Sequence, residues 1–186
     1  MNQCEELLKL LMEAVQQEGQ KKEKPCANGG IPVGVSNRHV HLSQADLDRL
    51  FGPGYELTKM KDLSQPGQYA CKEMVTVCGP KGAIEKVRIL GPVRRETQVE
   101  ILAGDGFKLG VKAPVRLSGD LDGTPGITLV GPKGSVQTEK GVMVAQRHIH
   151  MLPADAERFG VHDGQVVDLE LSLIHISEPT RLGMIS

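Results

Sequence analysis

The chain has 186 residues, a length that favours one compact unit or two small subdomains. A net charge of −1, the lack of a long basic run and the lack of a long apolar run give no sign of a nucleic-acid surface, a membrane span or a secretory signal. The four cysteines form no Cys-x-x-Cys pair and are typical of reduced thiols in a cytosolic protein, although their even number leaves disulfides open.

The first thirty residues differ from the rest. Residues 2–18 carry leucine, methionine and valine on one stripe, which predicts a short amphipathic helix. Residues 20–30 are polar and glycine-containing and are typical of a flexible linker. Such a helix would either dock on the body or a second subunit, or act as a targeting peptide that binds a partner.

The body is expected to begin at residue 31, with a strand over residues 31–35. Ser43 is a candidate N-cap for a helix over residues 44–51, and Gly52 ends that helix. A second helix is expected from Pro153 to Phe159, ended by Gly160.

Alternating apolar residues predict strands over residues 74–78 and 83–90, joined by the turn Gly-Pro-Lys-Gly at residues 79–82. The same four-residue turn recurs at residues 131–134, between expected strands 127–130 and 135–138. A further strand is expected over residues 165–170. Short strands and repeated turns predict a mainly β fold, a duplicated pair of small β-barrel subdomains with short helices and an N-terminal amphipathic helix.

Two near-copies of one motif hold four of the six histidines: Asn-Arg-His-Val-His-Leu at residues 37–42 and Gln-Arg-His-Ile-His-Met at residues 146–151. On a strand, residues i and i+2 face the same side, so each copy would direct two imidazoles at one place. Imidazole is a common transition-metal ligand, and the copies predict one metal centre built from both halves. The alternative is a structural pair preserved by duplication.

Residues 91–101 join the two halves. On a strand, Gln98 and Glu100 would share a face, with Arg94 on the same parity. Arg94 would suit phosphate because its planar fork donates paired hydrogen bonds, and Glu100 would suit a metal. A solvated strand face of mixed charge is the alternative for this segment.

Three segments, residues 31–43, 91–101 and 141–152, closely resemble the phosphate propanoyltransferase family, the phosphotransacylases of bacterial microcompartments. The matching strings are Ser-Asn-Arg-His-Val-His-Leu-Ser, Gly-Pro-x-Arg-x-x-Thr-Gln-Val-Glu and Arg-His-Ile-His-Met, in this order. The resemblance covers about residues 31–170.

The resemblance implies two β-barrel subdomains around a dinuclear zinc site, and the transfer of a propanoyl or similar short acyl group between coenzyme A and inorganic phosphate. It implies His39, His41 and Glu100 as ligands of one zinc, and His148 and His150 as ligands of the other. It implies Arg94 as the phosphate-binding arginine. Further polar pocket positions that it implies are Ser36, Gln98 and Ser118.

The same resemblance implies acyl-CoA, CoA and phosphate as ligands, and a microcompartment shell or lumen protein as partner of the N-terminal helix. A homo-oligomer is compatible with it. The expected location is the cytoplasm, inside a bacterial microcompartment such as those of propanediol degradation. No nucleic-acid or membrane partner is expected.

The C-terminus departs from the family pattern, which continues past residue 170 with closing strands and a further zinc-binding histidine. Residues 171–186 read Leu-Ser-Leu-Ile-His-Ile-Ser-Glu-Pro-Thr-Arg-Leu-Gly-Met-Ile-Ser, which resembles a translated sequencing adapter. We therefore expect residues 1–30 to be helix and linker, residues 31–170 the body, and residues 171–186 a non-native tail in place of the family's C-terminus. His175 would then be a chance residue, and His162 a surface residue.

Two other functions fit the residues alone. A zinc-dependent hydrolase would use activated water in place of phosphate. A non-enzymatic, shell-associated binding protein would use the histidine pairs structurally.

Overall fold

The structure is a computed structural model that describes residues 36–168 and 184–185. The chain divides into residues 1–34 and 35–186, and all of the described residues belong to the second unit. The expected N-terminal helix, its linker and the strand over residues 31–35 lie outside the described residues. No helix in the described part of the chain has the length and apolarity to cross a bilayer.

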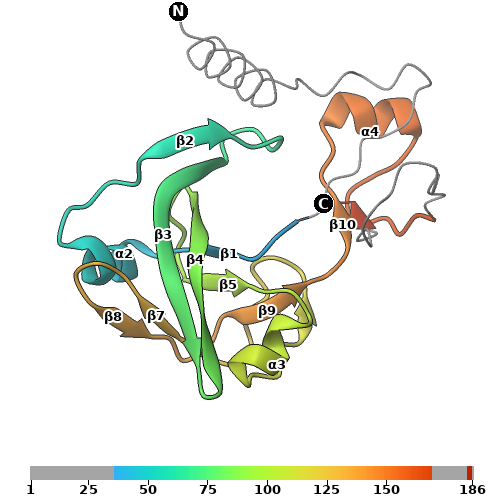
Figure 1. Cartoon of the computed structure of the whole chain (residues 1–186). Coiled ribbons are helices and arrows are strands. Elements are labelled where there is room, and N and C mark those ends of the chain that lie inside the picture. Colours follow the sequence, from blue (N-terminus) through green and yellow to red (C-terminus); the bar gives the residue numbers. More distant parts are fainter. Residues whose placement is uncertain (1–35, 169–183, 186) are drawn as a thin grey trace, which may run out of the picture. The chain divides into compact units, whose positions relative to one another are not determined.

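The described residues form a mainly β structure, as expected from the sequence (Figure 1). The strands are β1 (His39–His41), β2 (Lys59–Asp62), β3 (Tyr69–Gly79), β4 (Gly82–Gly91), β5 (Gln98–Glu100), β6 (Val115–Arg116), β7 (Thr128–Val130), β8 (Ser135–Gln137), β9 (Val142–Ala145), β10 (His148–Ile149) and β11 (Met184–Ile185). The helices are α2 (Gln44–Phe51), α3 (Asp105–Leu109) and α4 (Pro153–Phe159).

One curled sheet contains the first nine strands, in the order β6-β9-β5-β1-β4-β3-β7-β8 with β2 paired to β3. The short strand β1 lies inside this sheet, parallel to β4 and antiparallel to β5. Its central residue, Val40, is fully buried, which suits a strand with neighbours on both sides. Strand β10 pairs with β11 in a separate two-stranded sheet.

The hairpin β3–β4 is the longest element pair, and its alternation matches the pattern expected from the sequence. Val75, Val77, Val87 and Ile89 turn inward into the core. The core also takes Leu42, Leu47, Leu50, Val99, Ile101, Leu109, Leu129 and Val136. Burial of these aliphatic side chains is the main favourable contribution to folding.

Each of the two Gly-Pro-Lys-Gly turns caps the C-terminal end of a different helix. The backbone N–H of Lys81 donates to the carbonyl of Leu109 at the end of α3 (3.1 Å), and that of Lys133 donates to Leu50 in the last turn of α2 (2.9 Å). A Cβ on Gly79 would lie 2.2 Å from the Leu109 oxygen, and one on Gly131 would lie 2.6 Å from the Leu50 oxygen. Each turn therefore begins with glycine because the helix carbonyl it caps approaches the backbone too closely for a side chain.

The expected helices begin and end where the cap residues predicted. Ser43 accepts a hydrogen bond from the Asp46 N–H at the start of α2, and Gly52 ends the helix with φ of 111°. Helix α4 has Pro153 in its first turn and ends at Gly160 with φ of 65°. Each histidine strand is thus followed directly by a short helix.

Two expectations about strands need correction. Within the joining segment, Gly91 ends β4, residues 92–97 follow an irregular loop, and residues 98–100 form β5. Residues 165–168 form no strand, and the remaining residues of that expected strand are not described.

Candidate metal centre

His39 and His41 direct their rings toward the same place on one face of β1. The ring centroids lie 5.1 Å apart with the planes at 89°. Strand β5 runs antiparallel beside β1 with Glu100 opposite His39. Ligand atoms of His39, His41 and Glu100 all lie within 4.8 Å of one another. The two-residue period of neighbouring strands thus gathers three groups that could hold a metal ion.

The contact between His39 and Glu100 has the dimensions of a metal site. His39 Nδ1 lies 3.0 Å from the carbonyl oxygen of Asn37, so Nδ1 carries the proton and Nε2 is left for a ligand. His39 Nε2 lies 3.4 Å from Glu100 Oε2. The edge of a tetrahedral zinc site with bonds of about 2.0–2.1 Å is about 3.3–3.4 Å.

The charge state of Glu100 also suits a cation. Burial by itself would raise the pKa of this carboxyl, but the contacts with His39, the charge of His41 and the hydrogen bond from Gln98 lower the pKa to about 2. The carboxylate is therefore ionised at neutral pH although only 7% of the residue is exposed. For His39, burial lowers the pKa, but the hydrogen bond and charge of Glu100 outweigh it and the pKa is raised.

His41 offers the sharpest test of whether a metal fits. Burial, together with the charges of Arg94 and His39, lowers the pKa of this imidazole to about 3, so the ring is neutral. Its buried Nδ1 makes no hydrogen bond of ordinary geometry among the described residues, and the ring's one backbone contact, with Leu90, only partly offsets the lowering of its pKa. An orphaned buried nitrogen costs free energy unless something binds it. The residues of this cluster therefore fit a transition-metal ion such as zinc.

Gln98 links the cluster to a positively charged group. Its side-chain amide nitrogen donates to Glu100 Oε1 (2.6 Å) and to Ser118 Oγ (3.0 Å). Its oxygen accepts the Gly119 N–H at 2.8 Å. Arg94 Nη1 donates to the same Ser118 hydroxyl at 2.9 Å. A single network thus joins the carboxylate to a half-buried guanidinium, and Gln98, 1% exposed, lies at its centre.

The second histidine pair repeats the local design of the first. His148 Nδ1 lies 2.7 Å from the carbonyl oxygen of Gln146, two residues earlier, as His39 does with Asn37. His148 Nε2 therefore faces His150 Nε2, 2.7 Å away. Gln65, in the β2–β3 connection, lies 2.9 Å from His150 Nε2. In both pairs a carbonyl two residues earlier lies against Nδ1 of the first histidine and leaves its Nε2 for another contact, Glu100 for His39 and His150 for His148.

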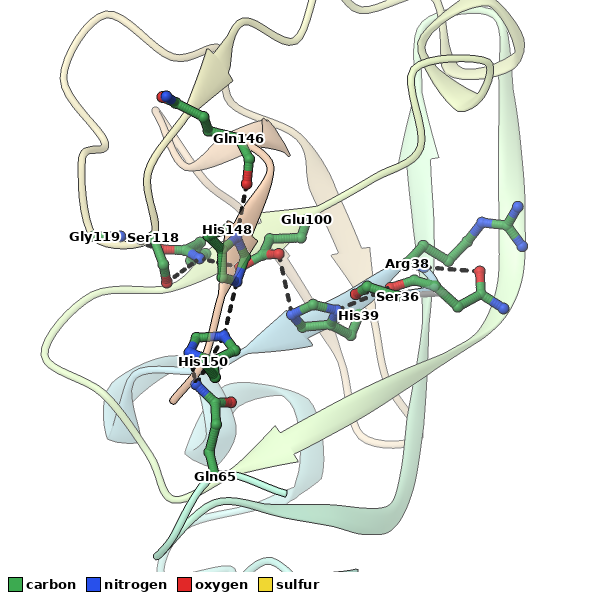
Figure 2. Close-up of polar contacts among 12 residues, drawn as sticks. Ser36, Arg38, His39, Gln65, Glu100, Ser118, Gly119, Gln146, His148 and His150 are labelled. Carbon is green, nitrogen blue, oxygen red and sulfur yellow. Dashed lines mark hydrogen bonds and ion pairs between the residues drawn. The ribbon is translucent and has the colours of Figure 1, made fainter. Parts of the chain in front are cut away.

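The two pairs lie in one region of the molecule. Figure 2 shows His148 and His150 on the same side of the sheet as His39 and Glu100. The negative charge of Glu100 acts on His150, although burial and the charge of His148 lower the pKa of His150 overall. That both halves contribute to one centre, and that two ions bind there, stay predictions.

Sequence reasoning missed a partly buried ion pair beside the cluster. Arg38 Nε donates to Asp105 Oδ2 (2.8 Å) and Arg38 Nη2 to Asp105 Oδ1 (3.0 Å). Asp105 also accepts the Leu102 N–H at 2.9 Å. The pair ties the start of β1 to the chain just after Glu100. An arginine directly precedes each histidine pair, Arg38 in the first copy and Arg147 in the second, and this repetition could have marked Arg38 as important. Nothing in the sequence near Asp105 marked it as the partner of Arg38.

The remaining predicted residues lie as follows. Ser36 is exposed, and its hydroxyl donates to the Asn37 carbonyl at 3.5 Å. Ser118 is exposed but holds Arg94 and Gln98. His162 is exposed, as expected for a surface residue, and lies 3.0 Å through Nδ1 from the carbonyl of Asp163. The solvated-face alternative for residues 98–100 is excluded because both Gln98 and Glu100 are buried.

A family model described as phosphate propanoyltransferase matches residues 32–176. The chain belongs to the phosphate propanoyltransferase family. A phosphate propanoyltransferase of Thermotoga maritima is 67% identical over 138 residues, which are 74% of this chain and 66% of that protein. One from Rhodobacter capsulatus is 63% identical over 142 residues, 76% of this chain and 66% of that protein. One from Priestia megaterium is 48% identical over 185 residues, 94% of this chain and 84% of that protein.

The chain spans 66% of the length of its Thermotoga and Rhodobacter relatives. The matched region contains both histidine pairs, Glu100 and Arg94. Membership of the phosphate propanoyltransferase family therefore rests on the part of the chain that carries the candidate centre.

Proposed function

We propose that this chain is a phosphate acyltransferase that converts a short acyl-CoA, such as propanoyl-CoA, and inorganic phosphate into acyl phosphate and CoA. The observation that supports this most directly is the position of Arg94. Its guanidinium is joined through Ser118 and Gln98 to Glu100, beside the candidate metal cluster. A fixed cation next to metal ligands suits a phosphate dianion better than a neutral substrate.

In this proposal two zinc ions are bound, one by His39, His41 and Glu100 and the other by His148 and His150 with a further ligand. The ions, when bound, supply positive charge that orients phosphate and stabilises the developing oxyanion. The carbonyl groups of Asn37 and Gln146 hold the protonated Nδ1 atoms of His39 and His148, so that Nε2 faces the ion.

Arg94 would bind two phosphate oxygens and leave a third directed at the thioester. A phosphate oxygen forms a bond with the acyl carbonyl carbon, and the bond from that carbon to sulfur breaks. The electron pair leaves on sulfur, and the CoA thiolate is protonated from solvent. Such direct attack needs no covalent acyl-enzyme, and neither Cys71, whose pKa burial raises to about 11, nor Cys78 is required.

Further parts of the proposal concern the whole protein. We propose that the body consists of two pseudo-repeated β-barrel subdomains, which the repeated turns and histidine strands support. The N-terminal helix would load the enzyme into a microcompartment through a shell or lumen protein. We also propose that residues 171–186 are a non-native tail.

A direct product assay separates this function from a zinc hydrolase. Propanoyl-CoA is incubated with the zinc-loaded chain with and without phosphate, and CoA release and acyl phosphate are both measured. The proposal requires that CoA release depends on phosphate and equals the acyl phosphate formed. Equal CoA release without phosphate would identify a hydrolase, and no turnover in a metal-loaded chain carrying a relative's C-terminus would favour the binding-protein alternative.

A further inference from the structure

The arginine proposed to bind phosphate lies on a loop that is tied to the first histidine strand at two points. The loop, residues 92–97, connects β4 to β5 and has no helix or long strand of its own. The first tie is made by Arg94 itself. Its backbone N–H donates to the carbonyl of Leu42 at 2.9 Å, and Ser43 and Arg94 form an isolated parallel bridge.

The second tie is the hydroxyl of Thr97, three residues further along. It accepts the backbone N–H of Ser43 at 2.9 Å and donates to Asp46 Oδ2 at 2.5 Å. The Ser43 hydroxyl donates to the same carboxylate oxygen at 3.0 Å. Thr97 is 7% exposed, so these hydrogen bonds are sheltered from water.

The first tie ends on Leu42 and Ser43, and the second ends on Ser43 and Asp46. Leu42 and Ser43 follow His41 directly, so Arg94 and Thr97, near the two ends of the loop, are both held beside the first histidine strand. The residue after Thr97 is Gln98, which bonds to Glu100 and to the Ser118 hydroxyl that holds Arg94. The backbone of the arginine and the amide that supports its side chain thus take their positions from the strand that carries His39 and His41.

We propose that Thr97, together with Asp46 and Ser43, is a positioning device that sets the place of Arg94 relative to the histidine cluster, and through it the affinity for phosphate. This inference rests on the proposed function of Arg94 as the phosphate-binding group. Capping of α2 does not account for Thr97, because Ser43 by itself accepts the Asp46 N–H. Thr97 adds only the connection between that cap and the loop.

The test uses three substitutions in the full-length, zinc-loaded chain. Thr97→Val keeps the side-chain shape but removes both hydrogen bonds, and Thr97→Ser keeps the hydroxyl. Thr124→Val is the matched control, because Thr124 is 6% exposed and its hydroxyl accepts the Gly141 N–H (2.8 Å) and donates to the Leu121 carbonyl (2.5 Å), with no bond to the arginine loop. Each valine variant loses one buried hydroxyl that accepts one backbone N–H and donates one short hydrogen bond, so a general loss of stability should be similar; Thr97 has in addition only a long contact of 3.4 Å with Ser43 Oγ.

Two readouts are needed, inorganic phosphate binding by titration calorimetry and hydrogen exchange of residues 92–97. We expect Thr97→Val to weaken phosphate binding about tenfold, equivalent to about 1.4 kcal/mol, and to speed exchange of the loop. Thr97→Ser should stay within about twofold of the unsubstituted chain, and Thr124→Val should change neither readout. In turnover, the KM for phosphate should rise in Thr97→Val while the KM for acyl-CoA stays unchanged.

The inference is overturned if Thr97→Val binds phosphate as the unsubstituted chain does, or if Thr124→Val weakens it equally. It is also overturned if both KM values rise together, since that is the pattern of a general structural defect. If phosphate binding depends on Thr97 and Arg94 but the chain forms no acyl phosphate, the proposed reaction is refuted and the positioning role remains supported.

Discussion

Arg94 and Arg95 are neighbours in the chain but differ sharply in their surroundings. Arg94 is half-buried against Ser118, while Arg95 is exposed. We expect Arg94→Ala to weaken phosphate use by about 2–4 kcal/mol, or about 30- to 1000-fold in KM, because a charge-assisted clamp to a buried anion is lost. Arg94→Lys should restore little, since a point charge does not reproduce the planar fork.

The matched control is Arg95→Ala, which removes the same charge from the same loop. The KM for phosphate of Arg95→Ala should stay within about twofold of that of the unsubstituted chain, as expected for the loss of an exposed charge. Steady-state kinetics with each substrate varied in turn measures both variants. If Arg94→Ala and Arg95→Ala behave alike, Arg94 contributes only to the general electrostatic field.

Glu73 is a buried carboxylate in β3 and gives the body a dependence on pH. Burial by itself would raise its pKa, but hydrogen bonds from the Thr58 N–H (3.1 Å) and the Tyr55 hydroxyl (3.0 Å) outweigh burial and lower the pKa. Because the folded pKa lies below the unfolded one, Glu73 stabilises the fold above the unfolded pKa of about 4.3. This stabilisation is lost as the pH falls through the folded pKa.

Urea unfolding of Glu73→Gln at several pH values checks this sign. The difference in free energy of unfolding between the unsubstituted chain and the variant should be largest near pH 7 and shrink as the pH falls below about 4. Glu85→Gln, on the exposed side of β4, is the control for the loss of one glutamate charge from the sheet. A difference that grows toward low pH would contradict the assignment.

At the scale of elements, the Gly-Pro-Lys-Gly turns show how two short helices are held. We expect Gly79→Ala and Gly131→Ala each to lower the free energy of unfolding by about 1–3 kcal/mol, because a Cβ would collide with the helix carbonyl that the turn caps. Gly104→Ala, where a Cβ meets nothing within 4 Å and φ is −67°, should be nearly neutral. Thermal and urea unfolding of the three variants measures this, and equal effects at all three would mean that the close approach is unimportant.

At the scale of the whole molecule, the first prediction concerns metal content. A chain whose residues 171–186 are replaced by the corresponding segment of a longer relative should bind about two zinc ions and form acyl phosphate faster than the present chain. The physical reason is that four histidines and Glu100 supply five ligands, more than one tetrahedral zinc uses, and the second ion would gain a missing ligand.

Elemental analysis and the product assay, run on both chains, test this prediction. His175→Ala in the present chain should change neither zinc content nor activity. Equal zinc and equal activity in the two chains would contradict the proposal that residues 171–186 are a non-native tail.

The second whole-molecule prediction concerns the N-terminal region. Deletion of residues 1–24 should leave folding and acyl transfer of the body nearly unchanged, because the polar residues 20–30 separate that segment from the body. Circular dichroism, thermal unfolding and the product assay measure the result. A deleted chain that no longer folds would place the segment in the core and refute a targeting role.

Much of the fold and part of the site were predictable from the sequence. The caps of α2 and α4, the hairpin β3–β4 and the repeated turns follow from residue types at short spacing, and the structure has them where expected. Of the expected strand over residues 165–170, residues 165–168 form no strand, and the last two residues are not described. For Arg94, the sequence indicated phosphate chemistry, but Arg94 lies on a loop and not on a strand with Gln98 and Glu100. It is linked to Gln98 through the Ser118 hydroxyl.

The sequence by itself determined the chemistry of the candidate centre: two His-x-His pairs, a carboxylate and an arginine, with the rings of each pair on one face. These features depend on spacings of two to four residues, which the backbone period decides locally. Only the tertiary structure decided that Glu100 lies opposite His39, that Gln98 joins it to Arg94, and that Arg38 pairs with Asp105. These contacts depend on the register of the strands and on the path of the loops. Packing of the whole sheet sets both, and short sequence spacings do not.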